Sequence, residues 1–111
     1  MAVVLVAKFA GDVTQLTRAY DEAHRVIMER GGAPGELRHH CAVGDAALWL
    51  IGVWESEELL RARFASAEFE ELLVSAGFPS PKSAEVTVLK LHAIEPPLTA
   101  THGNAPSDKP I

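Results

Sequence analysis

Two segments of this chain are apolar at consecutive positions, not only at alternating ones. Val3 to Phe9 is interrupted by Lys8 alone, and Ala47 to Trp54 contains no charged residue. A strand that packs against helices on one face and meets water on the other alternates apolar and polar side chains. Each segment is therefore predicted to be a strand with both faces buried.

A first helix is predicted between the two segments. Asp12 is a good N-cap, and Gln15 three residues later completes a capping-box pattern. The pair Gly31-Gly32 favours the left-handed backbone that ends helices, and Pro34 prevents continuation. Apolar side chains recur at helical spacing along one face, at Val13, Leu16, Tyr20, Ala23 and Ile27.

The middle of the chain predicts a β-hairpin, and its end predicts one more strand. Leu37–Val43 and Ala47–Trp54 flank the turn residues Gly44 and Asp45. The last strand is expected over Glu85–Ile94, because β-branched residues stand at its start.

The second helix is predicted to begin after Ser56, which is a favourable N-cap residue. Ser66 offers a second cap within the apolar pattern, so the segment is expected to allow two helical pieces. Gly77, followed by Pro79, ends it.

The resulting order, β-α-β-β-α-β, predicts an α+β domain with a ferredoxin-like fold. Its sheet is antiparallel, both helices lie on one face, and the first and third strands are central. The domain is predicted over residues 1–95, and residues 96–111, rich in proline and polar residues, are expected to form an extended or flexible tail.

Two helices cover only one face of such a sheet, so the second apolar face needs another cover. Soluble monomers rarely expose a large apolar patch, and packing two sheets about a twofold axis removes it. A homodimer is therefore predicted. The alternative is a monomer in which the C-terminal tail covers this face.

Charge and cysteine content narrow the class of partner. The net charge of −5 and the absence of a basic stripe argue against nucleic acid. No apolar run approaches the ~20 residues that span a bilayer, so no membrane partner is expected. The single Cys41 excludes an intramolecular disulfide and suits a reducing compartment, which predicts a cytoplasmic protein.

Three histidines are the candidate catalytic residues, because imidazole titrates near neutrality and serves as a general acid or base. His39 and His40 lie in the predicted second strand and His92 in the last one. Alternation sends His39 and Cys41 to one face and His40 to the other. The alternative is that these are ordinary surface histidines. No metal site is expected, because no ligand set shares an evident focus.

Two tryptophans and an arginine are the candidate substrate-binding residues. Trp49 and Trp54 stand in opposite phases of the third strand, so they face opposite sides of the sheet. Each either packs in a core or stacks on a flat ligand. Arg63 is a candidate partner for an anion or oxyanion. Cys41 is interpreted as a small buried apolar residue, not a nucleophile.

Val53–Glu58 (VWESEE) and Arg63–Phe69 (RFASAEF) give the chain a family resemblance. This region resembles the dimeric α+β barrel superfamily, in particular the antibiotic-biosynthesis-monooxygenase-like proteins. The resemblance implies a twofold dimer whose sheets form a barrel, with a ligand cavity between sheet and helices. Some members are cofactor-free monooxygenases acting on polycyclic aromatic substrates, and others degrade haem.

The residues that serve those activities in the family are not matched here. The resemblance implies an Asn in the first strand, but the only Asn in this chain is Asn104. Arg63 stands where a helical Trp is expected, and Leu73 stands near the position of a haem-ligating His. Haem degradation is therefore not expected, no cofactor is predicted, and the fold carries over without the family's sites.

The predicted function is that of a small-molecule-binding barrel, a cofactor-free monooxygenase acting on an apolar or aromatic substrate. The alternative is a non-catalytic ligand-binding or stress-associated barrel protein. An effector domain of a regulator is disfavoured, because no DNA-binding helices accompany the domain. The hypotheses are separated by whether at least two of the six candidate residues line one cavity.

Overall fold

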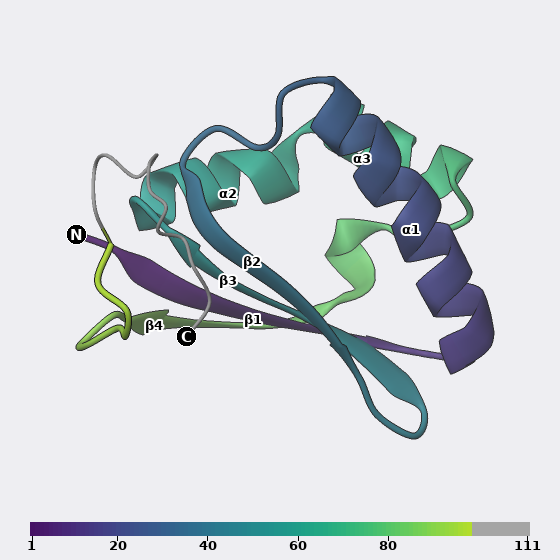
Figure 1. The fold of residues 1–111 in the computed structure, drawn as a ribbon. Coiled ribbons are helices and arrows are strands. Elements are labelled where there is room, and N and C mark those ends of the chain that lie inside the picture. Colours follow the sequence, from purple (N-terminus) through teal and green to yellow (C-terminus); the bar gives the residue numbers. More distant parts are fainter. Residues whose placement is uncertain (99–111) are drawn as a thin grey trace.

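A four-stranded antiparallel sheet lies beneath three helices in the computed structural model, which describes residues 1–98 (Figure 1). The elements follow the predicted order, with the second helix in two pieces. They are β1 (Val3–Ala10), α1 (Val13–Glu29), β2 (Glu36–Val43), β3 (Ala47–Trp54), α2 (Glu57–Ala65), α3 (Ala67–Ser75), a 3₁₀ turn (Pro81–Ser83) and β4 (Glu85–Lys90).

The sheet has the order β2-β3-β1-β4, so the two strands that are apolar on both faces are central, as predicted. Leu5 pairs with Gly52 and Val6 with Ile51, which sends the odd positions of β1 and the even positions of β3 to the same face. That face packs against the helices. All four odd-numbered side chains of β1 are buried there, Val3, Leu5, Ala7 and Phe9.

The main core lies between this face and the helices. Phe9, Leu48 and Leu60 are its largest fully buried side chains. Phe9 meets Phe78 edge to face, with ring centroids 4.8 Å apart. The core therefore ties the centre of the sheet to α2 and to the segment that follows α3.

Helix α1 begins with a simpler cap than the capping-box pattern predicts. The Asp12 carboxylate accepts a hydrogen bond from the backbone N–H of Thr14 at 3.2 Å. Within residues 1–98 the Gln15 side chain makes no bond back to Asp12. The start of the helix is thus predicted correctly, but only the Asp12 half of the capping box is formed.

Ser66 divides the second helical region, as the sequence allows. Its backbone is extended, and its hydroxyl accepts a hydrogen bond from the N–H of Phe69 at 3.1 Å. Ser56 plays the same part at the start of α2, accepting from the N–H of Leu59. The break turns α3 away from α2, so both short helices cover the sheet (Figure 1).

The last strand ends at Lys90, so the prediction of a strand reaching Ile94 is wrong. Lys90 pairs with Val3, the first residue of β1, and β4 has no other neighbour in the sheet. One further bond joins Leu91 N–H to the Ala2 carbonyl. The paired residues of β1 begin at Val3, so the ladder between β1 and β4 ends there despite the apolar sequence that follows Lys90.

The chain after β4 turns back toward β2. The Pro96 carbonyl accepts a hydrogen bond from the Arg38 guanidinium at 2.6 Å, and Arg38 points to the face away from the helices. Of the predicted tail, residues 99–111 lie outside the described residues. The division of the chain at residue 95 stays a prediction.

The face of the sheet away from the helices is apolar along its two central strands. Val4, Val6 and Ile51 are partly exposed there, and on β4 Leu89 is 53% exposed. We call this surface the open face. Among the described residues, no helix is long and apolar enough to cross a membrane.

Candidate functional site

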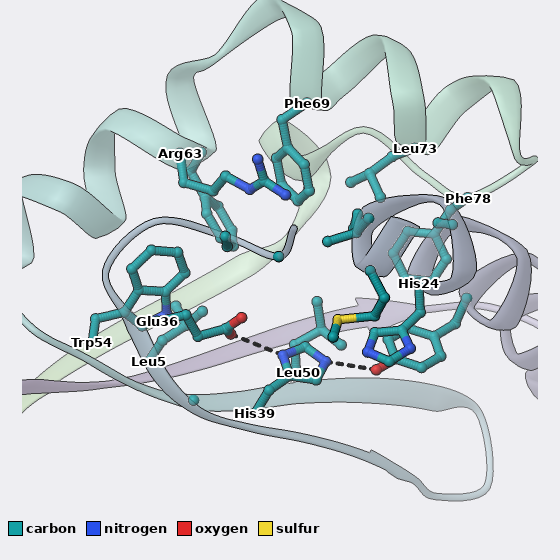
Figure 2. Close-up of a pocket in the computed structure, with 18 residues that line it drawn as sticks. Leu5, His24, Glu36, His39, Leu50, Trp54, Arg63, Phe69, Leu73 and Phe78 are labelled. Carbon is teal, nitrogen blue, oxygen red and sulfur yellow. Dashed lines mark hydrogen bonds and ion pairs between the residues drawn. The ribbon is translucent and has the colours of Figure 1, made fainter. Parts of the chain in front are cut away.

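A cavity of about 100 Å³ lies between the sheet and the three helices (Figure 2). Most of its wall is apolar, formed by leucines of the sheet and of α3 and by phenylalanines from the helical side. Its polar lining consists of Tyr20, His24, Glu36, His39, Trp54 and Arg63. A largely apolar cavity with few polar groups is the usual form of a small-molecule site.

Three of the polar side chains form a continuous hydrogen-bonded chain. The Tyr20 hydroxyl lies 2.6 Å from His39 Nε2, and His39 Nδ1 lies 2.8 Å from Glu36 Oε2. Figure 2 shows both contacts as dashed lines along the floor of the cavity. We call this chain the Glu36–His39–Tyr20 relay.

A β-bulge makes the relay possible. In a regular strand, residues three apart point to opposite faces, so Glu36 and His39 would be separated by the sheet. The pairing of β2 with β3 shifts between Glu36 and Arg38, which leaves Leu37 as the extra residue. The shift brings the Glu36 side chain to the same face as His39.

The positions of the hydrogens in the relay depend on the residues at its two ends, Glu36 and Tyr20. The Glu36 carboxylate can only accept, so His39 Nδ1 donates to it. Burial raises the pKa of Tyr20 well above its usual value, and the nearby Cys41 and Glu36 add to the rise. Tyr20 therefore keeps its proton, and its hydroxyl can donate to Nε2 while Nδ1 donates to Glu36.

His24 adds a third ring beside the relay. Its imidazole stacks on Tyr20, with centroids 5.3 Å apart, and on His39, with centroids 5.5 Å apart. Tyr20 and His39 are themselves nearly parallel, at 4°. The stack limits the rotation of all three rings and so holds the relay in place.

Arg63 supplies a cation on the helical side of the cavity. Its guanidinium lies over the ring of Phe69, 4.1 Å from the ring centroid. Burial lowers the pKa of Arg63, and the carboxylates of Glu36 and Glu68 oppose that change. Within residues 1–98 no carboxylate lies within salt-bridge distance of Arg63.

Trp54 lies at the end of β3 and is 2% exposed. Its Nε1 is the one buried side-chain polar atom in the described part of the chain that has no hydrogen-bond partner. Gly52 leaves room beside it, since a Cβ at position 52 would lie 3.1 Å from Glu36 Oε2 and 3.4 Å from Trp54 Nε1. The indole N–H is thus an unused donor at the cavity wall.

Three of the six predicted site residues line this cavity and three do not. His39, Trp54 and Arg63 come together in it. His40 and Trp49 point to the open face, where Trp49 packs against the Lys8 side chain. His92 is exposed beyond the end of β4. Strand alternation sends His39 and His40 to opposite faces of the sheet, and it does the same to Trp49 and Trp54. Only one histidine and one tryptophan of these pairs therefore reach the cavity.

Cys41 behaves as the sequence predicts. It is half-buried, and it shares the helix-facing side of the sheet with Leu50, its partner in β3. Burial raises the pKa of its thiol, and the charge of Asp21 adds to the rise. A protonated thiol is a poor nucleophile, so Cys41 acts as a small packing residue.

Three polar lining residues were not among the predicted site residues: Tyr20, His24 and Glu36. Tyr20 was assigned to the apolar stripe of the first helix, and His24 follows it by four residues, so both lie on one helix face. This polar pair within an apolar stripe is the signal that the sequence offered. For Glu36 there was none, because its orientation depends on the bulge.

No cluster suited to a metal ion is present among residues 1–98, where no three His, Cys, Asp or Glu side chains gather in that way. The relay is formed by one histidine and one carboxylate with a phenol, which is an arrangement for moving protons.

The fold resembles those of several solved oxygenases. SnoaB, a cofactor-independent oxygenase from Streptomyces nogalater, matches with a TM-score of 0.61 and 17% identity over 86% of this chain and 98% of SnoaB. The ActVA-Orf6 monooxygenase of Streptomyces coelicolor, solved with nanaomycin D, matches with a TM-score of 0.63 and 24% identity over 86% of this chain and 92% of that protein.

A putative antibiotic biosynthesis monooxygenase from Caulobacter crescentus gives a TM-score of 0.62 at 10% identity over 83% of this chain and 91% of that one. No protein-family model and no curated protein matches the chain. The structural likenesses confirm the predicted fold, a ferredoxin-like α+β domain of the type found in antibiotic-biosynthesis-monooxygenase-like proteins.

Proposed function

We propose that the protein is a cofactor-free monooxygenase that acts on a small apolar or aromatic molecule in the cavity beneath its sheet. The observation behind the proposal is the Glu36–His39–Tyr20 relay, which places a neutral, oriented imidazole at the wall of an apolar cavity. The fold shared with SnoaB and ActVA-Orf6 supports the choice of oxygen chemistry.

The first step is removal of an acidic proton from the substrate. Tyr20 lines the cavity, and in this step its oxygen accepts the proton while its own proton passes to His39 Nε2. The raised pKa of Tyr20 disfavours a free tyrosinate, so the proton comes to rest on His39. Glu36 then stabilises the imidazolium through its bond to Nδ1.

The second step uses the resulting carbanion or enolate as the reductant of dioxygen. An activated methylene is converted to a carbonyl, R–CH₂–R′ + O₂ giving R–CO–R′ + H₂O. One oxygen atom stays on the substrate carbon. The other leaves as water with the two hydrogens of the methylene, one of them returned by His39. All four electrons come from the substrate.

Oxygen uptake tests the proposal directly. The chelator-treated protein is mixed with phenylacetone or phenylpyruvate, one-ring molecules that both have an acidic methylene, and dioxygen is followed with an electrode. We expect one dioxygen per substrate oxidised, with no oxygen returned when catalase is added. Equimolar hydrogen peroxide, or a requirement for added flavin or metal, would contradict the proposal. Binding of both probes without oxygen uptake would favour a non-catalytic binding protein.

The open face supports a homodimer as the working form. It offers apolar side chains on both central strands, and all helices lie on the opposite face (Figure 1). Packing two such faces together about a twofold axis would bury them and close the barrel. The single cysteine suits a reducing compartment, which supports a cytoplasmic location as part of the proposal.

Ile51→Lys is expected to convert the dimer to a monomer. Ile51 lies near the middle of β3 on the open face, opposite Val6, and a buried unpaired ammonium there would be strongly unfavourable. Sedimentation velocity should give twice the chain mass of 11.9 kDa for the wild type and a single chain mass for the variant. Ala62→Lys, on the exposed side of α2, should stay dimeric. A monomeric wild type would contradict the dimer.

A further inference from the structure

The cavity contains two hydrogen-bond donors that nothing in the described structure uses. Arg63 is half-buried over Phe69, and Trp54 Nε1 is fully buried. Guanidinium and indole groups can only donate, so neither is satisfied by the other. Both line the same small space, which points to a ligand that brings acceptor oxygens.

The nearby acids do not neutralise Arg63. The Glu36 carboxylate is engaged with His39 at 2.8 Å, and the Glu68 carboxylate lies 3.7 Å from Arg30. By contrast, Arg61 on the same helix is exposed and pairs with Glu57 at 3.0 Å. A desolvated, unpaired cation is unfavourable unless a ligand supplies the counter-charge. A half-buried guanidinium with no paired carboxylate favours an occupant of the cavity that has a negative charge.

The volume of the cavity limits the body of that ligand. Its size of about 100 Å³ is below the ~150 Å³ of an engineered apolar protein cavity that binds benzene. A modest side-chain shift admits a single ring, and Met28, a flexible lining residue that is 57% exposed, is placed to make it. A fused three-ring body would need the helices to separate from the sheet.

We propose that the cavity binds a monocyclic oxyacid anion, a carboxylate or the enolate of a one-ring ketone, with its oxygens held by the Arg63 guanidinium and the Trp54 indole N–H. The apolar ring lies against the phenylalanine and leucine side chains of the wall. This inference rests on the proposed function only in taking the cavity as the substrate site, and it narrows the substrate class to small acids.

Binding of benzoate, measured by calorimetry without any turnover, tests the inference. Benzamide has the same ring and nearly the same shape without the charge, so the wild type should bind benzoate about 10- to 100-fold more tightly. Anthracene-2-carboxylate keeps the charge on three fused rings and should bind more weakly than benzoate. Equal affinity for benzoate and benzamide, or tighter binding of the three-ring acid, would overturn the proposal.

Matched arginine variants locate the anion. Arg63→Gln should lose about 10- to 100-fold of the benzoate affinity and leave benzamide unchanged. Arg61→Gln, two positions earlier on the same helix, should bind benzoate like the wild type. Loss of affinity in Arg61→Gln alone, or unchanged affinity in Arg63→Gln, would refute the assignment.

The two tryptophans provide a readout that needs no variant. In ¹⁵N-labelled protein, benzoate should shift the indole N–H resonance of Trp54 and leave that of Trp49 in place, because Trp49 points to the open face. An unmoved Trp54 signal at saturating benzoate would overturn its assigned role. If benzoate binds as expected but no probe consumes oxygen, the oxygenase proposal fails and the anion site stands. If oxygen uptake with phenylacetone is unchanged in Arg63→Gln, the anion site fails and the oxygenase proposal stands.

Discussion

His39→Gln is expected to lower kcat for oxygen uptake by about 10²- to 10⁴-fold, the usual contribution of a positioned general base. Glutamine keeps a polar side chain of similar size but cannot accept the proton that leaves Tyr20. The bonds to Tyr20 and Glu36 show that His39 is the only imidazole of the relay among residues 1–98. The measurement is the initial rate of oxygen uptake with phenylacetone or phenylpyruvate.

His40→Gln is the matched control for this prediction. His40 is the next residue in β2, is exposed and points to the open face. Its replacement should change kcat by about twofold or less, the effect expected of an exposed residue outside the site. If His40→Gln abolishes activity and His39→Gln retains it, the face of the sheet assigned to the chemistry is wrong.

Phe9→Ala should lower the free energy of unfolding by about 3–5 kcal/mol. Phe9 is 1% exposed and meets Phe78 edge to face at 4.8 Å, so its removal leaves a cavity where β1 meets the segment after α3. Urea titration at one fixed protein concentration measures the change, since the stability of a dimer depends on concentration. A loss below about 1 kcal/mol would place Phe9 outside the core.

Val74→Ala serves as the comparison for this variant. Val74 lies on α3 and is 55% exposed, so its truncation removes little buried surface. The expected change is about 0.5 kcal/mol or less, because alanine is also the better helix former. Together the two variants separate the burial of Phe9 from a general sensitivity to truncation.

The cavity has a polar lining although the residues expected from the family resemblance are missing. The first strand supplies only Leu5 to the cavity, and Arg63 occupies the helical position where a Trp was expected. The polar groups come instead from β2, from α1 and from the end of β3. The fold resembles those of the solved oxygenases, and the polar lining of the cavity differs from the residues that the family resemblance implies.

Local patterns in the sequence were sufficient to predict the order of the helices and strands and which two strands are central in the sheet. Strands that are apolar on both faces must be central, and Ser56 and Ser66 each stop the backbone in an extended cap that starts a helix. Strand alternation also separated His39 from His40 and Trp49 from Trp54. These features depend on neighbouring residues, so they can be read along the chain.

Only the tertiary structure decided which of the separated residues share a cavity and which contacts they make there. The Leu37 bulge turns Glu36 toward His39, and the packing of α1 on the sheet brings Tyr20 to a histidine 19 positions away. The extent of β4 was likewise set by its pairing with β1, whose first paired residue, Val3, lies opposite Lys90. Such outcomes depend on pairing and packing between distant segments, which no local pattern encodes.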